Sequence, residues 1–181
     1  ESYGLRLTSP EVSDSHYTFT LGSSSLNPGS TYTISVDMKF DGLATNGYEY
    51  GIAYTSVYLY GPDGLSSFKD FAFGENGVSS DWTTYNYKFT TPANFTKADI
   101  NLGFYRMSGK AGYDNLSIVD SEGNKVLSHI DKKTMKAACY FSEGYLPAIL
   151  DSGFEQTKLY MSSNKISMIM ASALPKTNGV S

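Results

Sequence analysis

Tyrosine recurs along residues 48–60 at a spacing that would bring several phenol rings together. Successive side chains of a strand point to opposite faces, so an extended run here would place five rings on one face: Tyr48, Tyr50, Tyr54, Tyr58 and Tyr60. Flat aromatic rings can stack on the apolar C–H faces of sugar rings while a few polar groups beside them bind the hydroxyls. Aromatic pairing across strands under a covered sheet face would give the same pattern, and the residue types leave both interpretations open.

Three further residues are candidates for the same chemistry. Tyr105 follows an alternating apolar run that ends at Phe104, so it would face the opposite side, together with Asn101 and next to Arg106. Trp82, the only tryptophan, opens a predicted strand.

The sequence contains no arrangement of residues typical of a catalytic site. A glycosidase needs two carboxylates that flank one bond, and the 18 acidic residues occur in no recognisable motif. The two histidines, His16 and His129, belong to no known catalytic pattern, and a lone cysteine such as Cys139 is typically a small buried apolar residue. The glycine patterns of phosphate and dinucleotide sites are absent as well, so the sequence favours binding over catalysis.

Charge and hydropathy exclude two classes of partner. The net charge is −4, whereas a nucleic-acid-binding protein needs a basic stripe that neutralises phosphates. The densest basic run, Lys132, Lys133 and Lys136, is typical of a solvated helix face. No stretch reaches the roughly 18 apolar residues that a spanning helix requires. We therefore expect neither nucleic-acid binding nor a membrane span.

Residues 1–125 have the pattern of short strands separated by turns. The clearest strand spans residues 31–40, where Tyr32, Ile34, Val36, Met38 and Phe40 alternate with polar residues. Breaker residues suggest the boundaries: Pro10 would end the first strand, and residues 109–112 would turn the chain. Seven or eight such strands without long helical patterns predict an all-β fold, a β-sandwich.

Residues 126–181 change in character. Asp131 could cap a short helix that continues to about Phe141 and stops at Gly144. The run from Asn164 to Leu174 fits a helix or a strand, and the sequence does not decide between them.

Four segments, in this order, resemble the carbohydrate-binding modules of families 4, 9 and 22: YGLRLT, LNPGSTYTISVDMKF, DWTTYNYKFTTP and AGYDNLSIVD. They cover residues 3–120. The resemblance implies a jelly-roll β-sandwich of two antiparallel sheets that binds glycans by aromatic stacking and hydrogen bonds. It also implies that Trp82 has a structural role in the core in preference to contact with a ligand. It also implies a structural calcium ion, for which Asp114 of the closing strand and Glu155 are the expected ligands.

The family's early N-x-G-F-E strand is missing at the start of the chain, and its counterpart is Asp151 to Glu155. Residues 1–125 would then be the sandwich, and residues 126–181 a C-terminal extension that completes it through residues 148–156. The alternative is that a second module begins there. We favour the first arrangement because a lone strand would leave an apolar face uncovered.

We therefore expect a non-catalytic module that binds an α- or β-glucan, starch among them, or xylan. It would belong to a larger multidomain protein, outside the cell or on its surface, and keep an attached enzyme or cell near the glycan. The alternative is a structural or adhesive β-sandwich spacer of a cell-surface or phage-tail protein, without a sugar site. A catalytic domain with an unrecognised site is a third, weaker alternative.

Overall fold

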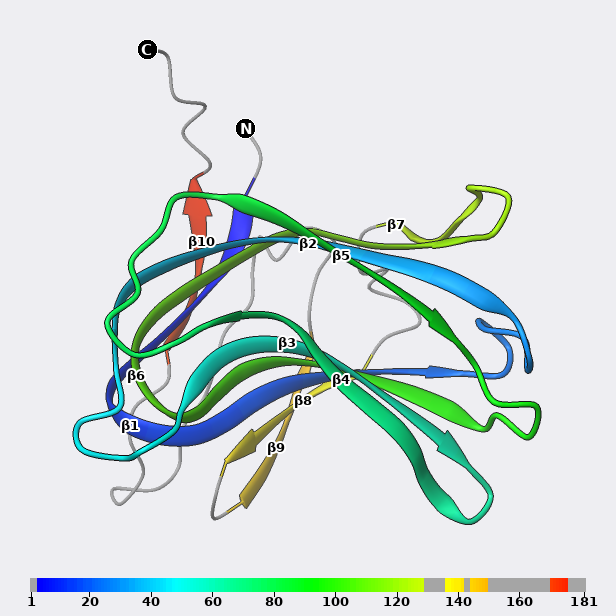
Figure 1. Cartoon of the computed structure of the whole chain (residues 1–181), viewed down its shortest axis with the longest axis horizontal. Helices are drawn as coiled ribbons and strands as arrows, with labels where there is room; N and C mark the ends of the chain where they lie inside the picture. Colours follow the sequence, from blue (N-terminus) through cyan, green and yellow to red (C-terminus); the bar gives the residue numbers. More distant parts are fainter. Residues whose placement is uncertain (1–2, 129–135, 142–143, 150–169, 176–181) are drawn as a thin grey trace.

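The computed structural model describes residues 3–128, 136–141, 144–149 and 170–175, and all regular structure within them is β. The strands are antiparallel, and they are connected in one sheet (Figure 1). In chain order they are β1 (Tyr3–Gly22), β2 (Thr31–Ala44), β3 (Ile52–Gly61), β4 (Gly64–Gly74), β5 (Thr83–Thr90), β6 (Lys97–Asp120), β7 (Lys125–Ser128), β8 (Lys136–Phe141), β9 (Gly144–Ile149) and β10 (Met170–Pro175).

The sheet folds back on itself and forms two layers, because β1 and β6 bend and pass through both (Figure 1). In layer A, residues 13–22 of β1 pair with residues 97–107 of β6. Strands β3 and β4 extend this layer on one side, and β8 and β9 extend it on the other. In layer B, residues 108–120 of β6 lie between β2 and the first half of β1, with β5 and β10 as outer strands and β7 beside the end of β6.

The breaker residues mark the bend of the sheet and do not end strands. Both predicted boundaries are wrong: β1 continues through Pro10, and β6 continues through Gly109. The registers shift at this point in β1 and β2, as expected where bulges and glycines turn a sheet corner. Gly109, at φ +116°, lies so close to β2 that an added Cβ would be 2.6 Å from the Gly42 carbonyl oxygen.

The core fills the space between the layers. The alternation predicted for residues 31–40 is confirmed, since Tyr32, Ile34, Val36, Met38 and Phe40 are all buried. Polar contacts between described residues also cross the core. The Tyr113 hydroxyl of layer B lies 3.3 Å from the main-chain oxygens of both Tyr54 and Gly103 in layer A, and Thr55 Oγ1 donates to the sulfur of Met38.

The C-terminal segment differs from the expected helix. Residues 136–141 form β8, which pairs with β1, so the helix predicted to continue to Phe141 is wrong in this part. The run from Asn164 to Leu174, which fits a helix or a strand by sequence, ends in a strand, because β10 pairs with the first half of β1. Residues 131–135 and 150–156, which complete the two C-terminal predictions, lie outside the described residues. Within those the structure does describe, no helix is long and apolar enough to cross a bilayer.

Candidate functional site

Strand β3 points three tyrosines away from the core. Ala53, Val57 and Leu59 belong to the core cluster, so the alternating residues Tyr54, Tyr58 and Tyr60 lie on the outer surface of layer A. Tyr54 is 8% exposed, and the other two are half-buried. The structure therefore places these tyrosines on an outer sheet surface and not between the layers.

Strand β4 adds two phenylalanines to this surface. Phe68 pairs with Tyr58 and Phe73 with Tyr54 across the two strands. The Tyr58 and Phe68 rings stack with their centroids 5.1 Å apart, yet Phe68 remains 58% exposed and Phe73 43%. We call Tyr54, Tyr58, Tyr60, Phe68 and Phe73 the aromatic face.

A row of polar residues crosses the middle of the aromatic face. Ser56 pairs with Asp70 on one side and with Asn101 on the other. The Ser56 hydroxyl is completely buried and has no hydrogen-bond partner. Burial raises the pKa of the Asp70 carboxyl, and Asn101 accepts a hydrogen bond from Thr18 at 2.7 Å. Donors and acceptors thus lie between two pairs of aromatic rings.

A second polar group lies at the Tyr60 end of this surface. Asp99 accepts hydrogen bonds from Thr20 at 2.6 Å and from Lys97 at 2.7 Å. The Lys97 ammonium lies 4.2 Å from the centre of the Tyr60 ring. Burial, and then the negative charge of Asp99, raises the pKa of the Tyr60 phenol. Lys97 is therefore fixed between a carboxylate and a ring, as expected for a pre-positioned polar contact.

The opposite end of the surface holds a cluster of three tyrosines and an arginine, which we call the corner cluster: Tyr48, Tyr50, Tyr105 and Arg106. The Arg106 guanidinium carbon lies 5.6 Å from the Tyr48 ring centroid and 5.2 Å from that of Tyr105. The Tyr50 and Tyr105 rings are 6.2 Å apart. Tyr105 faces away from the buried Phe104, as predicted.

The continuous stripe of five tyrosines predicted for residues 48–60 is wrong in its first part. Residues 45–51 form a turn, in which the Tyr48 amide donates to the Thr45 carbonyl and Gly47 adopts φ +101°. Strand β3 begins only at Ile52, so Tyr48 and Tyr50 project from the loop before it and join the corner cluster.

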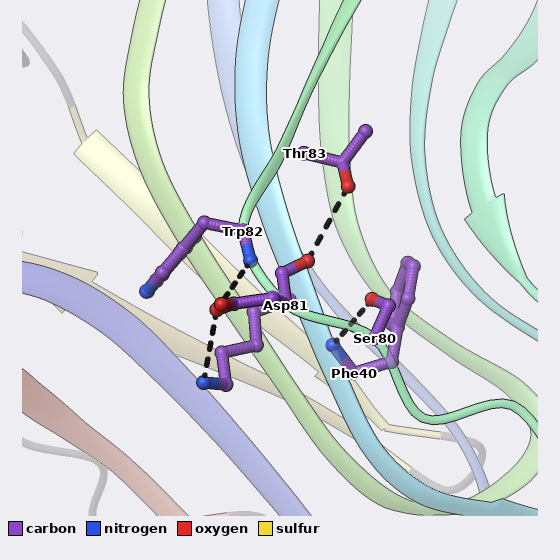
Figure 2. Close-up of polar contacts among 6 residues, drawn as sticks. Phe40, Ser80, Asp81, Trp82 and Thr83 are labelled. Atoms are coloured by element: carbon purple, nitrogen blue, oxygen red, sulfur yellow. Dashed lines mark hydrogen bonds and ion pairs between the residues drawn. The ribbon is translucent and has the colours of Figure 1, made fainter. Parts of the chain in front are cut away.

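Trp82 lies apart from both groups, just before β5 in layer B. It is half-buried and is not one of the core residues. Figure 2 shows how its neighbour Asp81 organises the turn: Asp81 Oδ1 accepts from the Trp82 amide at 2.8 Å and from Lys39 at 3.3 Å. These bonds lower the pKa of the Asp81 carboxyl, the Trp82 amide having the largest effect.

Of the two residues expected to bind calcium, the structure describes only Asp114. Asp114 is buried on β6 opposite Asp37, and its Oδ1 accepts from the Asn115 amide at 2.7 Å. Glu155 lies outside the described residues. Calcium takes six to eight oxygen ligands, whereas no cluster of three or more acidic, histidine or cysteine side chains occurs within the described ranges. Because Glu155 lies outside these ranges, the calcium site stays a prediction.

The sequence indicated the tyrosines of this surface but not their neighbours. Phe68, Phe73 and Asp70 of β4 were not predicted to share it with them, whereas Ser56 alternates in step with the tyrosines of β3. The turn at residues 61–64 was a usable signal, because a hairpin there places β4 beside β3. The pairing itself, however, depends on two register shifts in the hairpin.

The sequence matches no family model, and no curated protein is similar to it. Its fold, in contrast, is shared with solved structures. The carbohydrate-binding module (CBM) of PbXyn10C, without ligand, superposes with a TM-score of 0.51 at 15% identity, over 96% of this chain and 89% of that chain. The predicted resemblance to carbohydrate-binding modules and the predicted β-sandwich are thus confirmed for the fold.

Two other solved structures are similar over about two thirds of this chain. The enzymatically active domain of bacteriophage CBA120 tailspike protein 4 has a TM-score of 0.47 at 16% identity, over 64% of this chain and 15% of that chain. The CBM22-1–GH10 modules of Clostridium thermocellum endo-1,4-β-D-xylanase 10B, complexed with xylohexaose, have a TM-score of 0.46 at 18% identity, over 67% and 22%.

Proposed function

We propose that this chain, whose fold is that of a carbohydrate-binding module, binds a polysaccharide or oligosaccharide on the outer surface of layer A without cleaving it. The aromatic face would stack on sugar rings, and the polar residues between the rings would bind the hydroxyls. An α- or β-glucan or a xylan is the ligand class. The chain would act outside the cell or on its surface, as one part of a multidomain protein that it keeps near the glycan.

One observation supports this proposal above the others. Among residues 6–126 without Phe19, the part of the chain for which side-chain exposure is described, six large apolar side chains are exposed: Tyr48, Tyr50, Leu65, Phe68, Phe73 and Tyr105. All six lie on β4, in the loop that leads into β3, or opposite Ile52 of β3 on β6. An apolar surface concentrated around one strand is typical of a binding site.

The chemistry of this surface suits a sugar. Tyrosine and phenylalanine present large rings with few rotamers to restrict, so stacking costs little conformational entropy. In the middle of the aromatic face the half-buried Asp70 lies beside Ser56, whose hydroxyl has no hydrogen-bond partner. From the level of Ile52 to that of Tyr60 the surface follows eight residues of strand, which is about 27 Å at 3.4 Å per residue. A stretch of several sugar rings fits this length.

The test is affinity electrophoresis in gels containing starch, xylan, mixed-linkage β-glucan or soluble cellulose derivatives. The wild type should be retarded by at least one of them. Tyr58→Ala and Phe68→Ala each remove one ring of the stacked pair, and each should weaken that retardation. Trp82→Ala removes a ring from the other layer and should leave the retardation unchanged. Thermal unfolding of every variant separates lost binding from lost folding.

The rival function, a structural or adhesive spacer, predicts a different result. A spacer without a sugar site would migrate normally in every gel, and its exposed aromatic residues would then promote self-association, which analytical ultracentrifugation detects. Release of reducing sugars from any polysaccharide would contradict the non-catalytic part of the proposal.

A further inference from the structure

The corner cluster is built on an irregularity of β6. Ser13 and Ser15 of β1 pair with Met107 and Phe104 of β6, so the single residue between the two serines, Asp14, faces both Tyr105 and Arg106. This is a β-bulge, in which two residues oppose one and the chain is turned locally. It brings consecutive side chains of β6, which would otherwise point to opposite faces, to one end of the surface of layer A.

The bulge fixes the conformation of Arg106. Arg106 has φ +46°, in the left-handed region that residues other than glycine, asparagine and aspartate seldom adopt. Its amide donates to Asp14 Oδ1 at 2.6 Å. The main chain at Gly51 approaches so closely that a Cβ there would be 2.2 Å from the Arg106 carbonyl oxygen. Strain of this kind persists where the surroundings determine it, often at binding sites.

The Arg106 side chain has ring partners but no anionic partner. The guanidinium lies over the Tyr48 and Tyr105 rings and is exposed. No carboxylate in the described part of the chain forms an ion pair with it, whereas Lys39, Lys97 and Lys110 are each paired with an aspartate. The Lys97 ammonium, at the other end of the surface, is by contrast bound to Asp99.

We propose that Arg106 is a specificity-determining residue that binds the carboxylate of an acidic sugar, a uronic acid, within the glycan. The inference rests on the proposed function. A guanidinium matches a carboxylate with two parallel N–H···O bonds, which an ammonium cannot form. The tyrosines beside it would stack on the ring that bears the carboxylate. The net charge of −4 opposes unspecific attraction of a polyanion, so any preference for an acidic glycan must arise locally.

The test compares glucuronoxylan with the same preparation after chemical reduction of its carboxyl groups. The wild type should bind the carboxylated form about tenfold more tightly, which corresponds to about 1.4 kcal/mol. Arg106→Ala should abolish this preference, so that the variant binds the two forms with equal affinity. Arg106→Lys should keep only part of the preference, because an ammonium cannot form the two parallel hydrogen bonds that a guanidinium makes to a carboxylate. Lys88→Ala removes an exposed positive charge from β5 and should change nothing.

The preference should also shrink as salt is added, because mobile ions screen an exposed ion pair. Equal affinity for the two xylans would overturn the role of Arg106 but leave the proposed function standing. An unchanged preference in the Arg106→Ala variant would likewise overturn the role of Arg106 and leave the proposed function standing. If neither xylan nor any neutral glycan binds, the proposed function fails together with the inference.

Discussion

The buried hydroxyl of Ser56 allows a test in which stability and affinity should change in opposite directions. This hydroxyl lies in the middle of the aromatic face without a hydrogen-bond partner. A buried polar group left unpaired costs about 1–3 kcal/mol. Ser56→Ala removes the hydroxyl and keeps the Cβ. We expect it to raise the free energy of unfolding by roughly 1 kcal/mol, and the melting temperature by about 2–4 °C for a chain of this size.

The same substitution should weaken glycan binding. The hydroxyl is closed off in the free protein, so a sugar reaches it only when the side chains that cover it move on binding. A sugar hydroxyl would then supply the missing partner, and Ser56→Ala would remove one neutral hydrogen bond from the bound state, which contributes about 0.5–1.5 kcal/mol. The dissociation constant should then rise by roughly two- to tenfold. Melting followed by circular dichroism measures the change in melting temperature. Isothermal titration calorimetry measures the dissociation constant, with oligosaccharides of the glycan that retards the protein most in the gels.

Ser15→Ala is the matched control. The Ser15 hydroxyl is also buried without a partner, but it lies next to the core residue Phe104. This variant should be stabilised in the same way and bind the glycan like the wild type. The reasoning is refuted if Ser56→Ala binds as tightly as the wild type, or if it melts at a lower temperature.

Three other perturbations test the framework of the site. Burial lowers the pKa of His16 despite the opposing charge of Asp99, so the unfolded state binds more protons and stability should fall as pH drops below about 6.5. His16→Asn should flatten this slope in melting curves taken between about pH 7.5 and 5.5, and an unchanged slope would assign the titration to other groups. Gly103→Ala would place a Cβ 2.2 Å from the Ser15 carbonyl oxygen and should cost about 3 kcal/mol in urea unfolding; Gly22→Ala, with open space around it, should cost far less. Tyr113→Phe removes the donor shared by two carbonyls of layer A and should lower the melting temperature by about 2–4 °C. Equal melting of wild type and variant would show that this contact between the layers contributes nothing.

Period-2 alternation was enough to predict the core of β2, because a strand buried on one side carries its pattern in its own residues. The boundaries at Pro10 and Gly109 could not be predicted in the same way. A breaker residue allows the chain to turn back or only to bend, and the choice depends on partners far away in the sequence. Here β1 and β6 bend together, so each keeps the other paired through the corner.

The strand pairing within the aromatic face could not be predicted from the sequence either. Counting back from the turn, where Gly61 pairs with Gly64, would pair Tyr58 with residue 67 and Tyr54 with residue 71. The observed partners are Phe68 and Phe73, because one extra residue of β4 is inserted at each of two register shifts. A bulge likewise brings Arg106 beside Tyr105. Bulges depend on local energetics that the hydrophobic pattern does not record.

The position of β1 between strands made much later has a consequence during synthesis. Its first partner, β6, begins 75 residues after β1 ends, and its other partners, β8 and β10, come later still. At about 5–20 residues per second, β1 waits roughly 4–15 s on the ribosome before any partner emerges. During this delay its apolar face is open to other chains, and pairing over so long a loop is slow. Nascent molecules should therefore depend on chaperones more than the finished protein does.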